Sequence, residues 1–344
     1  MGVKIFDLVS NKNLEVKDLK NKIVGIDAFN VLYQFLSSIR GSDGALLQDS
    51  NGRVTSHLYG LFSRTMNLIT AGVKPVYVFD GKAPDLKYLE QKRRSDLKKE
   101  ALNKYEIAKQ SGDLDEMKKY ASRTSRLTQE MIEDAKLLID SMGVPIVQAP
   151  SEGEAQATFM CKQKDVYAVA SQDGDSLLFG APILIKNLTL NNKRKVSGTQ
   201  SYVDIKIEQI ELKTVLSELE ISQDQLIVLG ILIGTDFNQG GIKGIGPKKA
   251  LNLIKKHNEN FEALFEEVNW NNFYDFSYKE VINIFKNIKV NSEYSLKFNK
   301  PNKQKIIEIL VDKHNFSMDR INSTFEKYEK KQGELSQQNL GAWT

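Results

Sequence analysis

Short apolar runs rich in β-branched residues recur along the first half of the chain. They cover residues 22–27, 75–80, 144–150, 166–173 and 182–187. Runs of this length and composition are typical of strands that are buried on both faces of a parallel sheet. Helical patterns lie between them, at 30–39, 56–72 and 154–163. This alternation predicts an α/β fold with a central, mostly parallel sheet and helices on both faces.

One connection between predicted strands is much longer than the others. About 64 residues lie between Asp80 and Val144, where one helix and short loops would suffice. Residues 85–110 have a helical composition, a Ser-Gly-Asp sequence at 111–113 interrupts them, and a further helical pattern at 133–143 leads back to the sheet. We therefore expect an inserted helical arch that stands over one edge of the sheet.

The second half of the chain is mainly helical in pattern. From about Gln223 the helical stretches follow one another as far as Lys331. The last residues, 332–344, show no core periodicity, which predicts a flexible tail.

Composition excludes several classes of protein. A single cysteine, Cys161, rules out an internal disulfide and a cysteine-rich zinc site. No apolar run approaches 18 residues, and the N-terminal residues are too few and too polar for a signal peptide. We expect an intracellular protein with no membrane association.

Acidic residues lie where the predicted strands end. Asp27 and Asp80 end the first two strands, and the remaining acids follow later apolar runs: Glu152, Glu154, Asp173, Asp175 and Asp236. Because the carboxyl ends of parallel strands share one edge of a sheet, these side chains should converge there. Single acids also have structural explanations, since Asp27 could cap a helix, and Ser151 with Glu154 fits a capping box.

A cluster of seven carboxylates needs cations. Two carboxylates about 5 Å apart repel each other by roughly 3 kcal/mol at an effective dielectric constant of about 20. Oxygen ligands without cysteine or histidine select Mg²⁺, with Mn²⁺ as an alternative, and a pair of such ions suits the hydrolysis of phosphate esters. The sequence therefore predicts a metal-dependent phosphoesterase.

Positive charge is concentrated in the predicted arch. Between Lys82 and Arg126 there are 13 Lys and Arg against 8 Asp and Glu, so this segment carries +5 while the rest of the chain sums to −1. A solvated helix face is one explanation. Beside a phosphate-cleaving site, nucleic acid becomes the favoured substrate, with Lys87, Arg93 and Arg94 nearest to Asp80 in sequence.

A glycine-rich turn at 240–250 is the second feature that indicates DNA. Gly244 and Gly246 allow a tight turn, and Pro247 suits the first position of a helix. The exposed backbone N–H groups could receive a phosphate, with Lys248 and Lys249 beside them. A plain connection between two helices is the alternative.

In combination these motifs resemble the flap endonucleases of the structure-specific 5′ nuclease family. The resemblance runs along nearly the whole chain, through "GIDAFNVLYQFL", "KPVYVFDGKAPDLK", "VQAPSEGEAQA", "SQDGDSLLFG", "LIGTDF" and "GIKGIGPKKA". It implies cleavage of a DNA phosphodiester near the base of a 5′ flap, with 5′-exonuclease activity, in Okazaki-fragment maturation and long-patch base excision repair. It also implies that the glycine turn is a helix-two-turn-helix that holds duplex DNA with the help of a K⁺ ion.

The resemblance also assigns roles to single residues. It implies one Mg²⁺ among Asp27, Asp80, Glu152 and Glu154 and a second among Asp173, Asp175 and Asp236. Lys87 and Arg94 match arch residues that assist at the phosphate. Other positions match residues at or beside the DNA: Gly2, Tyr33, Arg40, Arg64 and Gly234.

The C-terminal tail resembles a peptide that binds the sliding clamp PCNA. Gln337, Leu340 and Trp343 have the spacing of that motif, in which two apolar side chains enter a pocket of the clamp. Thr344 stands where a second aromatic residue is usual, so a weaker clamp contact is expected.

These features divide the chain into five parts. We expect an N-terminal nuclease region (1–98), a helical arch or clamp (99–126), an internal nuclease region with the helix-two-turn-helix (127–258), a helical C-terminal region (259–331) and the tail (332–344). A DNA-associated monomer is expected, in the cytoplasm or nucleoid if the source is archaeal. Two alternatives are a related nuclease that prefers gaps, bubbles or duplex ends, and a non-catalytic junction-binding clamp adaptor.

Overall fold

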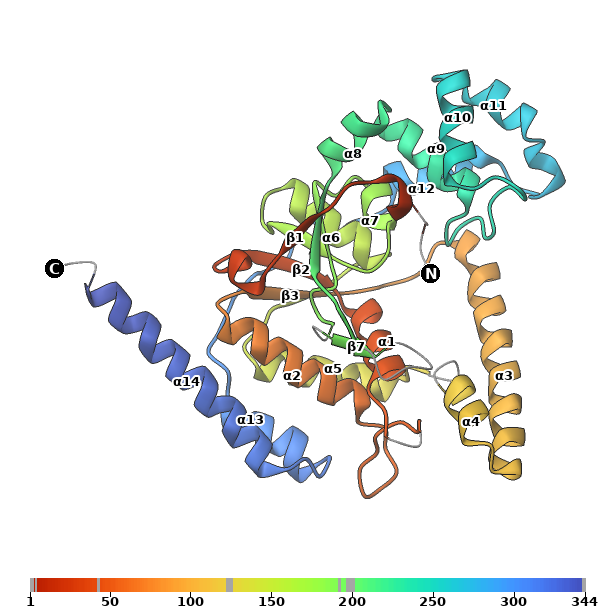
Figure 1. The fold of residues 1–344 in the computed structure, drawn as a ribbon. Coiled ribbons are helices and arrows are strands. Elements are labelled where there is room, and N and C mark those ends of the chain that lie inside the picture. Colours follow the sequence, from red (N-terminus) through yellow and green to blue (C-terminus); the bar gives the residue numbers. More distant parts are fainter. Residues whose placement is uncertain are drawn as a thin grey trace.

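The computed structural model describes residues 3, 5–41, 44–121, 126–190, 193–195 and 202–341. Its centre is a seven-stranded sheet with the order β1-β9-β6-β5-β2-β3-β4 (Figure 1). The strands are β1 (Lys12–Leu14), β2 (Ile23–Asp27), β3 (Lys74–Phe79), β4 (Ile146–Gln148), β5 (Ala168–Ala170), β6 (Ile183–Lys186) and β9 (Ile207–Glu211). A separate pair consists of β7 (Lys193–Lys195) and β8 (Tyr202–Asp204).

The five strands predicted from apolar runs are the five parallel strands of the sheet. β2 pairs in parallel with β3 and with β5, β3 pairs with β4, and β5 pairs with β6. The two further strands, β9 and β1, extend one edge with antiparallel pairing. The chain runs from β2 outward to β3 and β4 on one side and places β5 and β6 on the other, so the strand order reverses beside β2.

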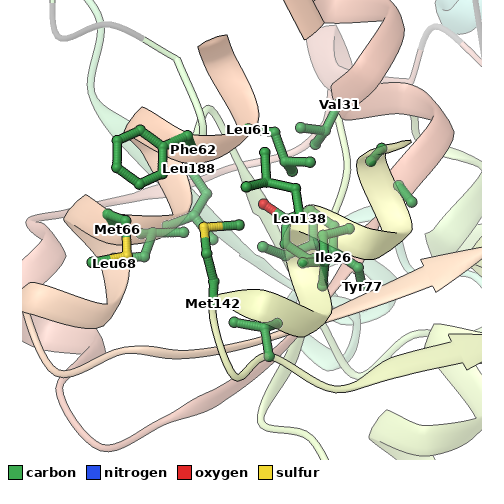
Figure 2. Close-up of a cluster of buried hydrophobic side chains, with 14 of the residues drawn as sticks. Ile26, Val31, Leu61, Phe62, Met66, Leu68, Tyr77, Leu138, Met142 and Leu188 are labelled. Carbon is green, nitrogen blue, oxygen red and sulfur yellow. The ribbon is translucent and has the colours of Figure 1, made fainter. Parts of the chain in front are cut away.

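Both faces of the sheet are covered. α1 (Ala28–Ser38), α2 (Ser56–Thr70) and α5 (Gln129–Ser141) share one apolar cluster with β2 and β3, and Figure 2 shows part of it. α6 (Gly153–Lys162) packs on the other face. Along β3, Tyr77 and Phe79 enter the first cluster, whereas Val76 and Val78 enter the second. This alternation confirms the predicted α/β class, with helices on both faces.

The predicted arch is a helical hairpin. After a 3₁₀ turn at Asp85–Lys87, α3 (Tyr88–Ser111) stands away from the sheet, and α4 (Leu114–Ala121) folds back along it (Figure 1). Gly112 ends α3 with φ 71°, a left-handed conformation that glycine adopts without strain. The predicted boundary between residues 98 and 99 falls inside α3.

The second half of the chain is helical, as predicted. A third apolar cluster is formed by α7 (Asp175–Leu178), α8 (Leu212–Leu219), α9 (Gln223–Ile233), α10 (Pro247–His257), α11 (Phe261–Glu267) and α12 (Tyr278–Asn287). An extended segment, 289–302, then leads to α13 (Lys303–Ile307), a π-helical turn (Glu308–Asp312) and α14 (Met318–Gly341). α14 packs on α2, and it continues ten residues past the predicted end of helical structure at Lys331.

Candidate active site

The first two acids lie at the carboxyl ends of neighbouring strands. Asp27 is the last residue of β2, is buried, and caps α1 by accepting a hydrogen bond from Asn30 N at 3.0 Å. Asp80 directly follows β3, and its Oδ1 accepts from Gly153 N at 2.7 Å. A Cβ at position 153 would lie 2.6 Å from that oxygen, so glycine there permits the close approach of α6 to Asp80. The hydrogen bond from Asn30 N confirms that Asp27 is the N-cap residue of α1.

The glutamates after β4 are held differently from the capping-box alternative. Glu152 is the N-cap residue of α6 without a side-chain cap, and its buried carboxylate pairs with Lys87 Nζ at 2.5 Å. Glu154 accepts a hydrogen bond from Ser171 Oγ, which follows β5, and not from the backbone N–H of Ser151 as a capping box requires. The capping box is therefore wrong, because the carboxylate of Glu154 turns to the neighbouring strand end instead of back along its own chain.

The acids after β5 join the same edge. Asp173 Oδ2 accepts from Asn30 Nδ2 at 3.3 Å, which ties it to the start of α1 beside Asp27. Asp175 begins α7, is buried, and accepts from Val3 N at 3.0 Å. Four neighbouring strands, β5, β2, β3 and β4, thus deliver acids to one edge, next to the point where the strand order reverses. This is where ligands bind in open α/β sheets.

Asp236 reaches this edge from the helical half of the chain. It follows α9 and pairs with Arg94 Nη2 at 2.5 Å and with Lys87 Nζ at 3.5 Å. Gly234, two residues before it, has φ 110°, and a Cβ there would lie 2.6 Å from Gly241 N. Lys87 and Arg94, at the base of α3, thus lie among the acids, as their closeness to Asp80 in sequence suggested.

These carboxylates lie close enough together to shift one another's pKa. Burial raises the pKa of Asp27 well above its usual range, and repulsion from Asp80 and Asp173 adds to it. Burial and repulsion from Asp236 and Asp173 raise the pKa of Asp175 to about 7. Burial opposes the charge of Lys87, but the nearby carboxylates outweigh it and raise the pKa of its ammonium group. The cluster carries more negative charge than its two cations balance.

The donor set fits hard divalent cations. Every proposed ligand is a carboxylate, which is the ligand type that Mg²⁺ and Mn²⁺ prefer. In the part of the chain that the structure describes, no group of three or more His, Cys, Asp or Glu side chains is arranged so that it could hold a metal ion. Lys87 and Arg94 pair with carboxylates that the metal ions would also bind. These carboxylates would therefore have to release the two side chains before they could bind a metal.

Several of the predicted DNA-contacting residues lie on or beside α1, α2 and α3. Tyr33, on α1, is 39% exposed, and the ammonium group of Lys98 on α3 lies 4.6 Å from its ring centroid. Arg40 follows α1 and donates to Gly44 O at 2.9 Å. Arg64 is a half-buried residue of α2. Arg93 is held by Glu90.

The glycine turn has the predicted local structure. Gly244 has φ 83°, and Gly246 is the N-cap of α10, with Pro247 at the first position. A Cβ on either glycine would meet nothing within 4 Å, so the turn is open to solvent. Lys248 and Lys249 are exposed on the first turn of the helix. The turn can therefore present backbone donors and lysines to a phosphate.

Some predicted residues are not placed. Gly2 and Trp343 lie outside the described residues. Gln337 and Leu340 are on the last turns of α14, where the backbone alone is described. The clamp-binding role of this segment stays a prediction.

Sequence reasoning missed two side chains at the site, Ser171 and Glu90. Ser171 follows β5 directly, as the acids follow their strands, and this position was the available signal. Glu90 stands four residues before Arg94 on a helix, a spacing that favours ion pairing.

Comparisons with known proteins identify the family of this chain. Residues 1–101 match the XPG N-terminal domain and residues 143–236 match the XPG I-region. The flap endonuclease 1 of Thermococcus onnurineus is 48% identical over 343 residues, covering 100% of this chain and 99% of the relative. This chain belongs to the flap endonuclease 1 family. The predicted enzyme class, a nuclease of DNA replication and repair, is thereby confirmed.

Solved structures support the fold of this flap endonuclease. Flap endonuclease-1 from Methanococcus jannaschii has a TM-score of 0.74 at 41% identity, covering 96% of this chain and 98% of that one. The catalytic core of Rad2 in complex with DNA substrate has a TM-score of 0.69 at 20% identity, covering 95% and 100%, and shares the fold. No helix among the described residues is both long and apolar enough to cross a membrane.

Proposed function

We propose that this flap endonuclease cleaves a DNA phosphodiester near the base of a 5′ flap, with an associated 5′-exonuclease activity, in Okazaki-fragment maturation and long-patch base excision repair. The observation that carries the proposal is the convergence of seven carboxylates from four strand ends and the end of α9, at the foot of a cationic helix. Binding DNA alone would not favour so many acids beside phosphates, which argues against a non-catalytic adaptor.

The proposed metal ligands fall into two sets. Asp27, Asp80, Glu152 and Glu154 would hold one Mg²⁺, and Asp173, Asp175 and Asp236 would hold the other. Bound magnesium supplies Lewis-acid activation of water and stabilises the charge on the scissile phosphate. The hydrogen bonds from Asn30, Gly153 and Val3 fix carboxylates of both sets in place.

Lys87 and Arg94 are proposed to contact the scissile phosphate. Both already lie within ion-pairing distance of Asp236, so each needs only a small change of side-chain conformation to meet a phosphate there. Their positive charges stabilise the charge that develops on the phosphate oxygens as the bond breaks. Tyr33 offers a half-exposed ring on which a base beside the cleaved bond can stack.

The duplex is proposed to lie between the acid cluster and the glycine turn. The N–H groups around Gly244 and Gly246, with Lys248 and Lys249, would hold its backbone, with a K⁺ ion at the helix-two-turn-helix. Arg40, Arg64 and Arg93 would add phosphate contacts, while Gly2 and the loop at Gly234 would lie beside the reacting strand. Gln337, Leu340 and Trp343 would bind a PCNA-type sliding clamp.

Cleavage of labelled flap, bubble and blunt duplex DNA with Mg²⁺ or EDTA tests the proposed function. We expect a product cut at the base of the flap, present with Mg²⁺ and absent with EDTA. Preferred cutting of bubbles or duplex ends would favour a related 5′ nuclease. Cutting in EDTA, or no cutting of any flap, would contradict the proposal.

Asp175 offers the sharpest test of the metal assignment. Asp175→Ala removes a buried carboxylate that two neighbouring acids repel and one backbone N–H holds. We expect cleavage to fall by more than about a hundredfold, the upper end of losses that follow from outer-shell changes alone. Flap binding, measured by fluorescence anisotropy in Ca²⁺, should change little. Activity equal to that of the wild type would contradict the ligand role.

A further inference from the structure

Glu90 is a buried carboxylate that the proposed reaction does not use. It lies in the first turn of α3 and is 4% exposed. Its Oε2 and Oε1 accept hydrogen bonds at 2.9 Å from Nε and Nη2 of Arg93, and Oε1 also accepts from Arg94 Nε at 2.5 Å. A helix-dipole contact alone would leave such a side chain in solvent. Here one carboxylate is instead enclosed by two guanidinium groups.

Arg94 is therefore held from two sides. Its Nε binds Glu90, and its Nη2 binds Asp236 Oδ1 at 2.5 Å. The ion pairs of Lys87, in contrast, are with Glu152 and Asp236, both members of the proposed metal set. If Glu152 and Asp236 held ions, Lys87 would lose both of these partners and Arg94 would lose Asp236. Glu90 stands outside the cluster and keeps its hold on Arg94.

The contact with Arg93 and Arg94 favours the ionised form of Glu90. Burial alone would raise the pKa of Glu90, but the hydrogen bonds from Arg93 and Arg94 outweigh burial and lower it. A charge-assisted hydrogen bond from a guanidinium group also fixes direction, because the donors lie in one plane. One end of Arg94 is therefore fixed, and its other N–H groups are left for the site.

We propose that Glu90 is a positioning residue that anchors Arg94 at the rim of the carboxylate cluster, so that its remaining N–H groups meet the scissile phosphate. This inference rests on the flap-cleaving function proposed above. Arg93 completes the anchor through a bidentate pair with Glu90, in which its Nε donates to Oε2 and its Nη2 donates to the Oε1 that Arg94 also binds. The arch thus supplies both the cation and the group that orients it, from residues one helical turn apart on α3.

The test compares Glu90→Gln with Glu100→Gln, a matched control on the same helix. Glu100 is exposed and pairs with exposed Lys104, so the control makes the same change of charge without touching Arg94. We expect the single-turnover cleavage rate of Glu90→Gln to fall about fivefold to tenfold, a typical size for a broken coupling between neighbours. Flap binding in Ca²⁺ should stay within about twofold for both variants, as should cleavage by Glu100→Gln.

A double-mutant cycle identifies the residue through which Glu90 acts. In an Arg94→Ala background, Glu90→Gln should slow cleavage by less than about twofold, because there is no guanidinium group left to position. An equal loss in both backgrounds, or a Glu90→Gln rate like that of the control, would overturn the proposal. If Arg94→Ala alone cleaves at the wild-type rate, the proposed phosphate contact of Arg94 fails, and the anchor fails with it.

Glu90→Asp keeps the test valid if Glu90→Gln does not fold. It retains the charge but shortens the side chain by one methylene group, so the bond to Arg94 is lost first. Thermal unfolding should match that of the wild type, while the cleavage rate falls as for Glu90→Gln. A normal rate for folded Glu90→Asp, alongside a slow Arg94→Ala, would overturn the anchor and leave the flap-cleaving function intact.

Discussion

At the residue scale, the ammonium group of Lys87 balances part of the negative charge of the acid cluster. Its side chain is 14% exposed and lies between Glu152 and Asp236, whose side chains are 11% and 14% exposed. A buried carboxylate is costly unless it is paired, and breaking one buried pair typically costs about 3–5 kcal/mol. The lysine is therefore a stabilising counter-ion as well as a proposed contact of the phosphate.

Lys87→Met should destabilise the protein most when divalent ions are absent. The change leaves Glu152 without its nearest cation, so we expect the free energy of unfolding in EDTA to fall by about 3 kcal/mol. Added Mg²⁺ should recover much of the loss, because the ions restore positive charge. Denaturant unfolding with and without Mg²⁺ measures both. Lys104→Met, at an exposed pair, should change stability by less than about 0.5 kcal/mol; the same loss in both variants would contradict this account.

The buried side chain of His57 should make the folding stability of the protein depend on pH. It is 1% exposed on α2, and burial, together with repulsion from His314, lowers its pKa to about 4 despite the attraction of Asp134. The unfolded chain takes up a proton on this histidine below about pH 6.5, whereas the folded protein does so only near pH 4. Stability from neutral His57 is therefore complete above pH 6.5 and is lost as the pH falls toward 4.

His57→Phe should flatten that response. Phenylalanine fills a similar volume and binds no proton, so the variant should lose about 2 kcal/mol less than the wild type between pH 7 and pH 5. The measurement is the free energy of unfolding from urea titrations at both pH values. Equal losses in the two proteins would show that another group controls the acid response.

At the scale of elements, the arch packs mainly on itself. α3 and α4 pack mainly on each other, and α3 carries exposed apolar side chains at Leu97, Leu102 and Ile107. Two helices that bury so little apolar surface open more easily than the sheet does. The turn at Gly112 keeps them side by side.

Gly112→Ala should loosen the arch without affecting the body. The Cβ meets nothing within 4 Å, so the cost comes from φ 71° alone, about 1 kcal/mol. Amide hydrogen exchange should be several-fold faster over 105–117, with exchange in β2 and β3 unchanged. Gly333→Ala, inside α14, is the opposite-sign control, because alanine favours a helix interior. Faster exchange throughout the sheet would contradict a local effect.

Sequence reasoning succeeded where side chains alone determine the element. The five parallel strands lie between helices that cover both faces of the sheet, so the sequence of each strand is a continuous apolar run. β1 and β9 were missed, because β1 is only three residues long and Ile207–Glu211 mixes apolar with polar residues, so both strands depend on their antiparallel neighbours for pairing. Glu154 was misread because its partner, Ser171, follows a different strand. Glu90 was missed although its spacing to Arg94 favours an ion pair, because spacing does not reveal that its carboxylate is buried.

At the scale of the whole molecule, the C-terminal helices complete the core. Ile306, Leu310, Ile321 and Phe325 are fully or nearly fully buried in the same cluster as the apolar face of α2. The proposed clamp peptide begins on the last turns of α14, with Gln337 and Leu340, and ends with Trp343 outside the described residues.

Deleting residues 337–344 should therefore separate the two functions. Cleavage of free flap DNA should stay within about twofold of the wild type, since no residue of the acid cluster or the core is removed. Stimulation by the sliding clamp should be lost with Leu340 and Trp343. Cleavage assays with and without the clamp measure both quantities, and an unchanged response to the clamp would place its contact elsewhere.

The packing of α14 on α2 also determines when this protein can finish folding. α2 ends at residue 70 and α14 begins at residue 318, so the ribosome makes the two partners far apart in time. At a typical speed of about 5–20 residues per second, the interval is roughly 10–50 seconds. Throughout that interval the part of α2 that α14 covers stays exposed on the nascent chain, while α1, α5 and β3 can already pack on the rest of it.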